Sequence, residues 1–550
     1  MTVTEDVPTA ASAPPEPAAP APAASGLAAV LGSGDHKVVG RLWMVASLVH
    51  LVLVGLAAIA TAAEKIDTST LDVVGDDWFA QVFTFRSIGG AFLFLLPLTI
   101  GIFTAVVPLQ VGAPTIAFPR AASAAAWAYL VGSGLIVGAY AIGGGPYGSD
   151  VDGLRLFVVA FGLVLLAQIV AWICIVTTAV TLRAPGLSLP RLPLFSWSAV
   201  VAGGVWLLTL PVLLTLVALT YVDIRYGGSE GIFGGGAATV YERISWTFHQ
   251  PTIYAFAIPA LGIVGSVVPV FSATRHQSHR LAMGLVGAFG ALAVGAWAIP
   301  SFAGSEARPW LYEIPWIVVS FAIVLPLLGL LGLWALTARA GKLTLGSPLI
   351  FGLVAVLMLL VGAIAGAVQA IEPLETLLDG DAAGPLFGTT WTTSVASYVV
   401  LATAAALFGG AIYWAPKVIG RSFAEGPAKA IAVVMLAGTV LWSFPELLAG
   451  LFGQAALPGT LAENEDTIEA LNAATTVGGV LLALAAAGFV ALLLKALSSS
   501  DLPGDDPWSG HTLEWATSSP PPVGNFASLP EITSEAPLYD ARHRTEEASA

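Results

Sequence analysis

Charged residues are scarce in this chain of 550 residues. Asp, Glu, Lys and Arg together make up 10% of it, against 57% hydrophobic residues, and the mean hydropathy is +0.85. A soluble globular domain carries about 25% charged residues, so the composition excludes that class and indicates an integral membrane protein. At about 20 residues for each membrane-spanning helix, the length allows roughly a dozen spans.

Cysteine is nearly absent, because Cys174 is the only one and it lies inside an apolar run. A single thiol can form no internal disulfide and no CxxC metal motif, so a small buried residue is the simplest interpretation of Cys174. The sequence also contains no nucleic-acid-binding patch, phosphate-binding loop or nucleophile motif. We therefore expect no nucleic-acid partner, and the lipid bilayer is the partner that the composition implies.

Two segments without long apolar runs flank the hydrophobic part of the chain. Residues 1–34 are rich in Ala and Pro, which predicts a disordered tail, and they lack the cationic start and apolar stretch of a signal peptide. Residues 498–550 form a polar, Pro-rich C-terminal tail. The membrane domain at 35–497 contains twelve apolar runs long enough to cross hydrocarbon as helices, at 38–62, 84–107, 123–143, 154–180, 198–221, 247–271, 281–302, 314–337, 347–370, 389–412, 428–451 and 472–497.

The charges between these runs alternate from one connection to the next. If the N-terminus is cytoplasmic, thirteen Lys and Arg residues fall in cytoplasmic connections, and the opposite connections hold only Lys65, Arg155, Arg225, Arg243 and Arg308. This bias satisfies the positive-inside rule. It predicts a multi-pass protein with both termini in the cytoplasm. The alternation also supports the count of twelve spans, because one missed span would place every later connection on the wrong side of the membrane.

Several motifs resemble those of subunit I of the heme-copper oxidases, the cytochrome c oxidase family. The stretch from Trp246 to Tyr254 resembles the sixth membrane helix of that family, which reads Trp-x-x-Gly-His-Pro-Glu-Val-Tyr. Further similar motifs follow the second span at 107–120, leave the tenth span at 413–421 and occupy the tail at 507–526. The resemblance covers about 35–545. It implies an all-α membrane fold of twelve helices in three arcs, and a place in the respiratory chain of a bacterial cytoplasmic membrane.

The family binds two hemes and copper through six histidines, because neutral imidazole suits iron and copper. This chain has seven histidines, and only His50 and His249 fall inside the predicted spans. The aligned positions hold other residues: Arg86 and Ser397 for the low-spin heme, Val395 for the high-spin heme, and Gln250, Ile299 and Pro300 for copper. We therefore predict no bound heme or copper, and a collapsed apolar interior where the high-spin heme would lie.

Tyr254 matches the tyrosine that the family crosslinks to its copper-binding histidine, and His249 lies one place before that histidine's position. A residual copper site at His249 is one interpretation. A hydrogen-bonded residue near the mouth of the sixth span is the favoured one, because a metal ion needs several convergent ligands and Gln250 is a poor one. For His50, which matches no family ligand, we expect a hydrogen bond within the bundle.

Arg86 replaces a low-spin heme ligand with a guanidinium, which costs about 2.5–3.5 kcal/mol at the centre of a membrane helix. Glu446 is the only carboxylate well inside a predicted span, and it lies at a similar depth. One hypothesis is an Arg86–Glu446 ion pair that fills the low-spin heme space. The alternative is that each side chain extends separately to the membrane interface.

Three functions remain open at this stage. The first is a redox-inactive, structural relative of oxidase subunit I, with subunit II-like or III-like membrane proteins as partners. The second is an active terminal oxidase that reduces O2 and pumps protons, which the loss of ligands opposes. The third is a transporter or channel on the same scaffold, with Arg86 and Glu446 as gating groups.

Overall fold

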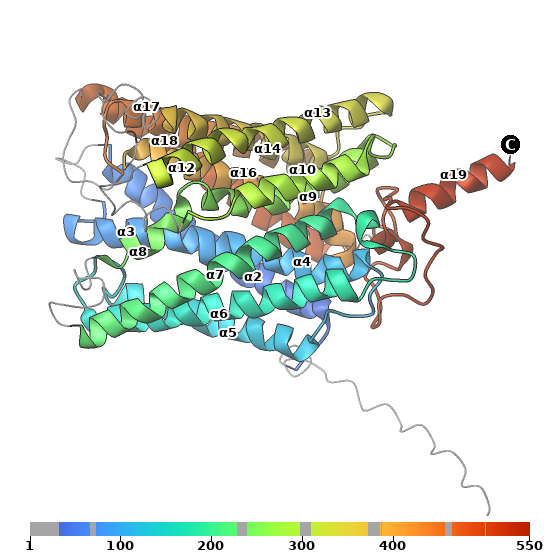
Figure 1. Ribbon diagram of the computed structural model, residues 1–550, viewed down its shortest axis with the longest axis horizontal. Coiled ribbons are helices and arrows are strands. Elements are labelled where there is room, and N and C mark those ends of the chain that lie inside the picture. The colour runs from blue at the N-terminus through green and yellow to red at the C-terminus, as the bar shows by residue number, and fades with distance from the viewer. Residues whose placement is uncertain are drawn as a thin grey trace, which may run out of the picture. The chain divides into compact units, whose positions relative to one another are not determined.

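The structure is a computed structural model that describes residues 32–66, 73–227, 239–296, 310–371, 386, 388–456, 465–500 and 502–549. Gly34–Ala550 form one compact unit, in which long helices lie side by side (Figure 1). Within the described ranges every regular element is helical, apart from one isolated bridge between Thr389 and Ala455. The predicted all-α class is confirmed, while the tail predicted at 1–34 lies almost entirely outside these ranges.

In the described part of the chain, eleven helical segments are long and apolar enough to cross a membrane, and each overlaps one predicted span. They are α2 (His36–Glu64), α3 with the π-helix η1 and α4 (Asp76–Ile88, Gly89–Leu95 and Leu96–Gln110), α5 (Pro119–Ala141), α6 (Val151–Thr181), α7 (Leu194–Tyr226), η5 with α9 (Thr252–Ala257 and Ile258–Phe271), α12 with α13 (Trp310–Ala322 and Val324–Ala340), α14 (Ser347–Gln369), α16 (Thr390–Val418), α17 (Glu425–Leu451) and α18 (Glu465–Ser498).

The predicted seventh span at 281–302 is represented by a shorter helix, α10 (His279–Leu292), of 14 residues. At 1.5 Å per residue such a helix is about 21 Å long, less than the ~30 Å of a hydrocarbon core. Residues 297–309, which include Ile299 and Pro300, lie outside the described ranges. The count of twelve spanning helices therefore stays a prediction.

The second span changes from α-helix to π-helix at Gly89, three residues after Arg86. Side chains of neighbouring helices donate hydrogen bonds to two backbone carbonyls of this wider turn. The carbonyl of Phe92 accepts from Gln168 Nε2 at 2.8 Å, and that of Leu93 accepts from the Tyr129 hydroxyl at 2.6 Å. Short π-helical segments occur often at functional sites, and here α5 and α6 hold one in place beside Arg86.

The sixth span differs from the continuous helix predicted at 247–271. A 3-10 turn at Trp246–Phe248 (η4) is followed by the 3-10 helix η5, and the α-helix begins only at Ile258. Pro251 and Pro259 each lack the backbone N–H that an α-helix needs, which accounts for the irregular backbone. As a result, Gln250 and Tyr254 lie where the span is not α-helical.

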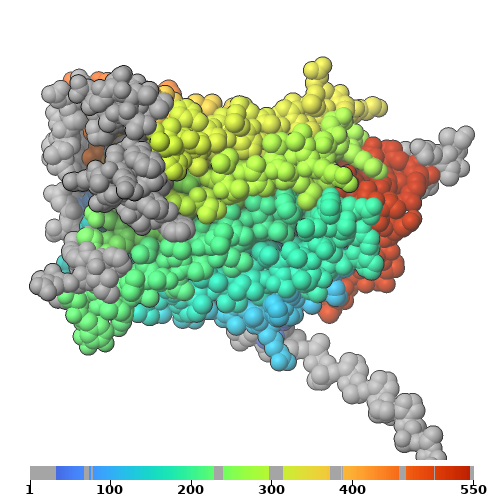
Figure 2. Space-filling view, viewed as in Figure 1, coloured from blue at the N-terminus to red at the C-terminus, as the bar shows by residue number. Residues whose placement is uncertain are grey.

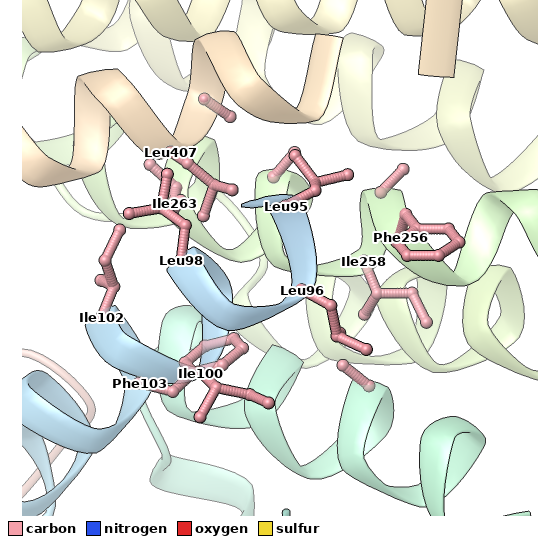
Figure 3. Packing of buried hydrophobic residues seen from close by; sticks show 14 of the residues in the cluster. Leu95, Leu96, Leu98, Ile100, Ile102, Phe103, Phe256, Ile258, Ile263 and Leu407 are labelled. Carbon is pink, nitrogen blue, oxygen red and sulfur yellow. The ribbon is translucent and has the colours of Figure 1, made fainter. Parts of the chain in front are cut away.

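The core is packed by aliphatic and aromatic side chains from several spans. Figure 3 shows Leu95, Leu98 and Phe103 of the second span beside Ile263 of α9 and Leu407 of α16, all of which are at most 3% exposed. Close helix contacts depend on small residues, since a Cβ on Gly40 of α2 would lie 2.7 Å from the Gly101 carbonyl oxygen of α4. Membrane helices approach closely in this way.

Residues of the C-terminal tail cover one end of the bundle, called the tail end below (red in Figure 2). Glu514, which is fully buried, accepts hydrogen bonds from Gln110 Nε2 at 3.0 Å and Trp414 Nε1 at 3.1 Å. Burial raises the pKa of Glu514, and hydrogen bonds such as that from Gln110 oppose the rise. Asn525 donates to the Ala113 carbonyl at 2.7 Å and accepts from Lys37 Nζ at 3.1 Å. The tail motif therefore packs against the spans themselves.

Candidate functional site

Arg86 lies in the last turn of α3 with its guanidinium between two aromatic rings. The Cζ atom is 5.1 Å from the ring centroid of Phe83 and 5.2 Å from that of Trp442 on α17. Its Nη1 atom also donates a long hydrogen bond, 3.5 Å, to Thr61 Oγ1 on α2. A cation over an aromatic face contributes about 0.5–2 kcal/mol, so the Trp442 ring holds Arg86 against α17, and the hydrogen bond to Thr61 links it to α2.

Trp442 contacts both Arg86 and Ser397, the two residues that the sequence resemblance predicts at the low-spin heme positions. Its indole ring faces Arg86 on one side, and its Nε1 donates to Ser397 Oγ on α16 at 3.3 Å. Trp442 is 5% exposed and lies against α18, where a Cβ on Gly479 would come within 2.8 Å of the ring. The space between Arg86 and Ser397 is therefore occupied by one indole.

Glu446 lies one turn after Trp442 on α17 and is 4% exposed. The charges of Arg86 and Lys65 both act on its carboxylate. Lys65, at the end of α2, donates to the Ala456 carbonyl at 3.3 Å. Among the described ion pairs within 4.0 Å, none joins Arg86 to Glu446. The described residues thus contain no Arg86–Glu446 ion pair within 4.0 Å, and the carboxylate interacts with a second cation, Lys65.

Both the oxygen and the nitrogen of the Gln250 side-chain amide, predicted at the position of the copper-binding histidine, form hydrogen bonds. Its Oε1 accepts from the Tyr254 hydroxyl at 3.0 Å, and its Nε2 donates to the Gly366 carbonyl at 2.9 Å and to Gln369 Oε1 at 3.3 Å. The network continues from Gln369 Nε2 to Thr392 Oγ1 at 2.7 Å. These bonds join the sixth span to α14 and α16.

The other residues singled out from the sequence lie in different surroundings. Val395 is 2% exposed and belongs to the hydrophobic core. His50 contacts the Ala46 carbonyl through Nδ1 at 2.8 Å and the Tyr129 hydroxyl at 3.4 Å, so the predicted hydrogen bond within the bundle is confirmed. His249 is partly buried between η4 and η5.

Residues 38–481 match the family model described as cytochrome c and quinol oxidase polypeptide I. The chain belongs to that oxidase polypeptide I family. It is 29% identical over 560 residues to cytochrome c oxidase subunit 1 of Corynebacterium glutamicum, covering 96% of this chain and 91% of that protein. Against cytochrome c oxidase subunit 1 of Corynebacterium diphtheriae it is 28% identical over 559 residues, covering 96% and 95%.

A solved structure supports the same fold. A heme-copper terminal oxidase dimer, determined by cryo-EM, matches with a TM-score of 0.63 at 14% identity, over 86% of this chain and 84% of that one. At this identity the likeness concerns the fold alone. The predicted oxidase subunit I-like bundle is thereby confirmed, and the protein is a multi-pass membrane protein with bacterial oxidase relatives.

The oxidase polypeptide I family implies two hemes and copper, and the side chains at the aligned positions do not fit them. Arg86 has donors only, and Val395 has no polar atom. The Ser397 hydroxyl accepts from Trp442, and the amide of Gln250 is committed to three hydrogen bonds. Ile299 and Pro300, whose side chains carry no donor atom, lie outside the described residues. The family uses imidazole ligands for its hemes and copper, and Arg86, Val395, Ser397 and Gln250 carry none.

Trp442, Lys65, Gln369 and Thr392 were not identified from the sequence as parts of these clusters. A tryptophan in an apolar run is typical of helix packing or of an interfacial belt, and Lys65 lies in a connection. A polar residue in a span is costly, which is the signal by which Gln369, near the end of a predicted span, could have been found.

Replacing Gln250 by Leu tests the amide network. We expect a loss of about 1–3 kcal/mol in unfolding free energy, because the Tyr254 hydroxyl and the Gln369 amide would lose buried partners. The midpoint of thermal unfolding in detergent measures the change, and the exposed Gln277 offers a matched control in Gln277→Leu. Equal midpoints for the two variants would show that the network does not stabilise the fold.

Proposed function

We propose that this chain is a redox-inactive, structural member of a bacterial respiratory complex, built on the oxidase subunit I scaffold. One observation carries the proposal: Trp442 contacts both Arg86 and Ser397, the residues that the sequence resemblance assigns to the two low-spin heme positions. A porphyrin ring held between axial ligands needs that space, and an indole with a guanidinium over its face already occupies it.

The surfaces that connect and close the bundle support a structural role. Glu514 and Asn525 of the tail motif bind residues of the spans through buried hydrogen bonds. The relatives are named as subunits of cytochrome c oxidase, so partners of this chain would be subunit II-like or III-like membrane proteins. The charge bias of the connections favours the cytoplasmic membrane with both termini in the cytoplasm.

Visible absorption spectroscopy tests the proposal directly. The full-length protein is purified from its native membranes in mild detergent, beside an oxidase that retains its six histidines, and both are examined for heme absorption and copper content. We expect less than one heme in ten chains of this protein, and full occupancy in the reference oxidase. Near-stoichiometric heme in this protein would overturn the proposal and favour an active terminal oxidase.

Purification from native membranes also tests the structural role. If the chain is a subunit, a defined set of membrane proteins should remain bound through washing at high salt, since hydrophobic contacts between spans resist screening. A chain that purifies alone, under conditions that keep a known oxidase complex intact, would contradict the assignment to a complex.

A further inference from the structure

Two histidines at the tail end are oriented in the same unusual way. His276 lies in the connection between α9 and α10, and His279 is the first residue of α10. Nε2 of His276 is 2.6 Å from the Gly265 carbonyl oxygen, and Nε2 of His279 is 2.9 Å from the Leu192 carbonyl oxygen. A carbonyl oxygen can only accept, so Nε2 carries the proton in each neutral ring, and Nδ1 presents a lone pair.

Both Nδ1 atoms are buried and have no hydrogen-bond partner among the described residues. The ring centroids lie 6.1 Å apart at an interplanar angle of 44°. A buried acceptor without a partner costs about 1–3 kcal/mol, and such groups in folded proteins usually have a reason. Two of them side by side, three residues apart in the sequence, point to one shared ligand.

The chemistry of the pair fits a transition metal. Histidines that bind metal ions usually donate their other ring N–H to a backbone carbonyl or carboxylate, which fixes the tautomer and the ring. Burial, together with the nearby His279, lowers the pKa of His276 to about 4, so this ring is neutral at pH 7. Neutral imidazole is the form that binds Zn²⁺, Ni²⁺ and Cu²⁺.

The C-terminal tail brings further possible ligands close to the two histidines, and the positive charges of two nearby arginines are balanced by carboxylates. His511 and Glu535 of the tail lie close enough for His511 to interact with His276, and Glu535 with His279. Two arginines nearby are paired with carboxylates, since Arg275 contacts Asp540 and Arg542 lies 3.1 Å from Asp506. No three His, Cys, Asp or Glu side chains in the described ranges are placed as a complete metal site.

We propose that His276 and His279 bind one divalent transition-metal ion through their Nδ1 atoms, between the connection before α10 and the C-terminal tail. Solvent or a side chain of the tail completes the coordination, so the two imidazoles form an open site. The pair is independent of the former heme and copper positions, which lie on other residues, and the inference does not depend on the proposed structural role.

Zinc titration of the full-length protein, expressed without a histidine tag, tests this site by calorimetry. We expect one Zn²⁺ per chain, and a loss of affinity of about tenfold or more in His276→Ala and in His279→Ala, because each removes one of the two oriented ligands. His50→Gln, in the middle of α2, serves as the control and should bind zinc as the original chain does.

A second measurement guards against misfolded variants. Cys174 is the only cysteine and is 1% exposed, so slow reaction with a thiol reagent shows that a variant keeps its fold. In correctly folded protein, Zn²⁺ should also slow the carbethoxylation of His276, detected by mass spectrometry. Absence of zinc binding, or binding of equal strength in the original chain and in both alanine variants, would overturn the proposal.

Discussion

Replacement of Trp442 by Ala lowers the unfolding free energy by about 3–5 kcal/mol, the range for a buried aromatic side chain removed from a core. The indole packs against α18, donates to Ser397 and covers the guanidinium of Arg86. Its removal leaves a cavity and also takes away one of the two ring faces that hold a charge within the bundle. The midpoint of thermal unfolding, followed by the reaction of Cys174 with a fluorescent thiol reagent, measures the loss.

Two further variants test whether the loss of stability in Trp442→Ala is specific to this position. Trp78→Ala removes an indole that is 43% exposed, so its midpoint should change little. Trp442→Phe keeps an aromatic face for Arg86 but loses the hydrogen bond to Ser397, so it should fall between the original chain and Trp442→Ala. If Trp442→Ala and Trp78→Ala had the same midpoint, the indole would not be what fills the low-spin heme space.

Replacement of Glu446 by Leu is expected to lower the unfolding free energy by about 3–5 kcal/mol. This is the loss typical of removing one partner of a buried charge pair. Arg86 and Lys65, both partly buried, would then lose the carboxylate on which both act. Glu446 is 4% exposed, so bulk solvent does little to screen its charge. The exposed pair Arg544–Glu531 provides the control, since Glu531→Leu should change the stability by about 0–1 kcal/mol.

A double-mutant cycle identifies which cation Glu446 stabilises. Arg86→Met and Lys65→Met are each combined with Glu446→Leu, and the coupling energy is obtained from unfolding midpoints. We expect coupling of about 0.5–3 kcal/mol with at least one of the two cations. Coupling near zero for both would discard the hypothesis that these charges act as a unit and would favour separate side chains at the membrane interface.

The spans, the family motifs and the substituted ligand positions follow from local properties of the chain. Hydropathy is summed over consecutive residues, so the long apolar runs could be located without any knowledge of their neighbours. The scarcity of histidine within the runs, and the residues Arg86, Val395, Ser397 and Gln250 at the aligned positions, are equally visible in the sequence. The membrane class could therefore be predicted, and the loss of the metal ligands stays a prediction.

The breaks in the helices were harder to predict. The 3-10 helix η5 and the π-helix η1 both lie in apolar runs that were predicted as continuous helices. Proline accounts for the first, but the second is held by hydrogen bonds from Tyr129 and Gln168. These residues lie on other spans, and no local pattern indicates that they reach Leu93 and Phe92.

By itself, the sequence determined that this chain is a membrane protein that resembles the oxidase polypeptide I family, and it predicted other residues at the histidine ligand positions. Only the tertiary structure showed that Trp442 lies between Arg86 and Ser397, and that Lys65 interacts with Glu446. The physical reason is that composition and periodicity describe the properties of a single helix. The contacts of a side chain between helices depend on how each helix is rotated, kinked and packed against its neighbours.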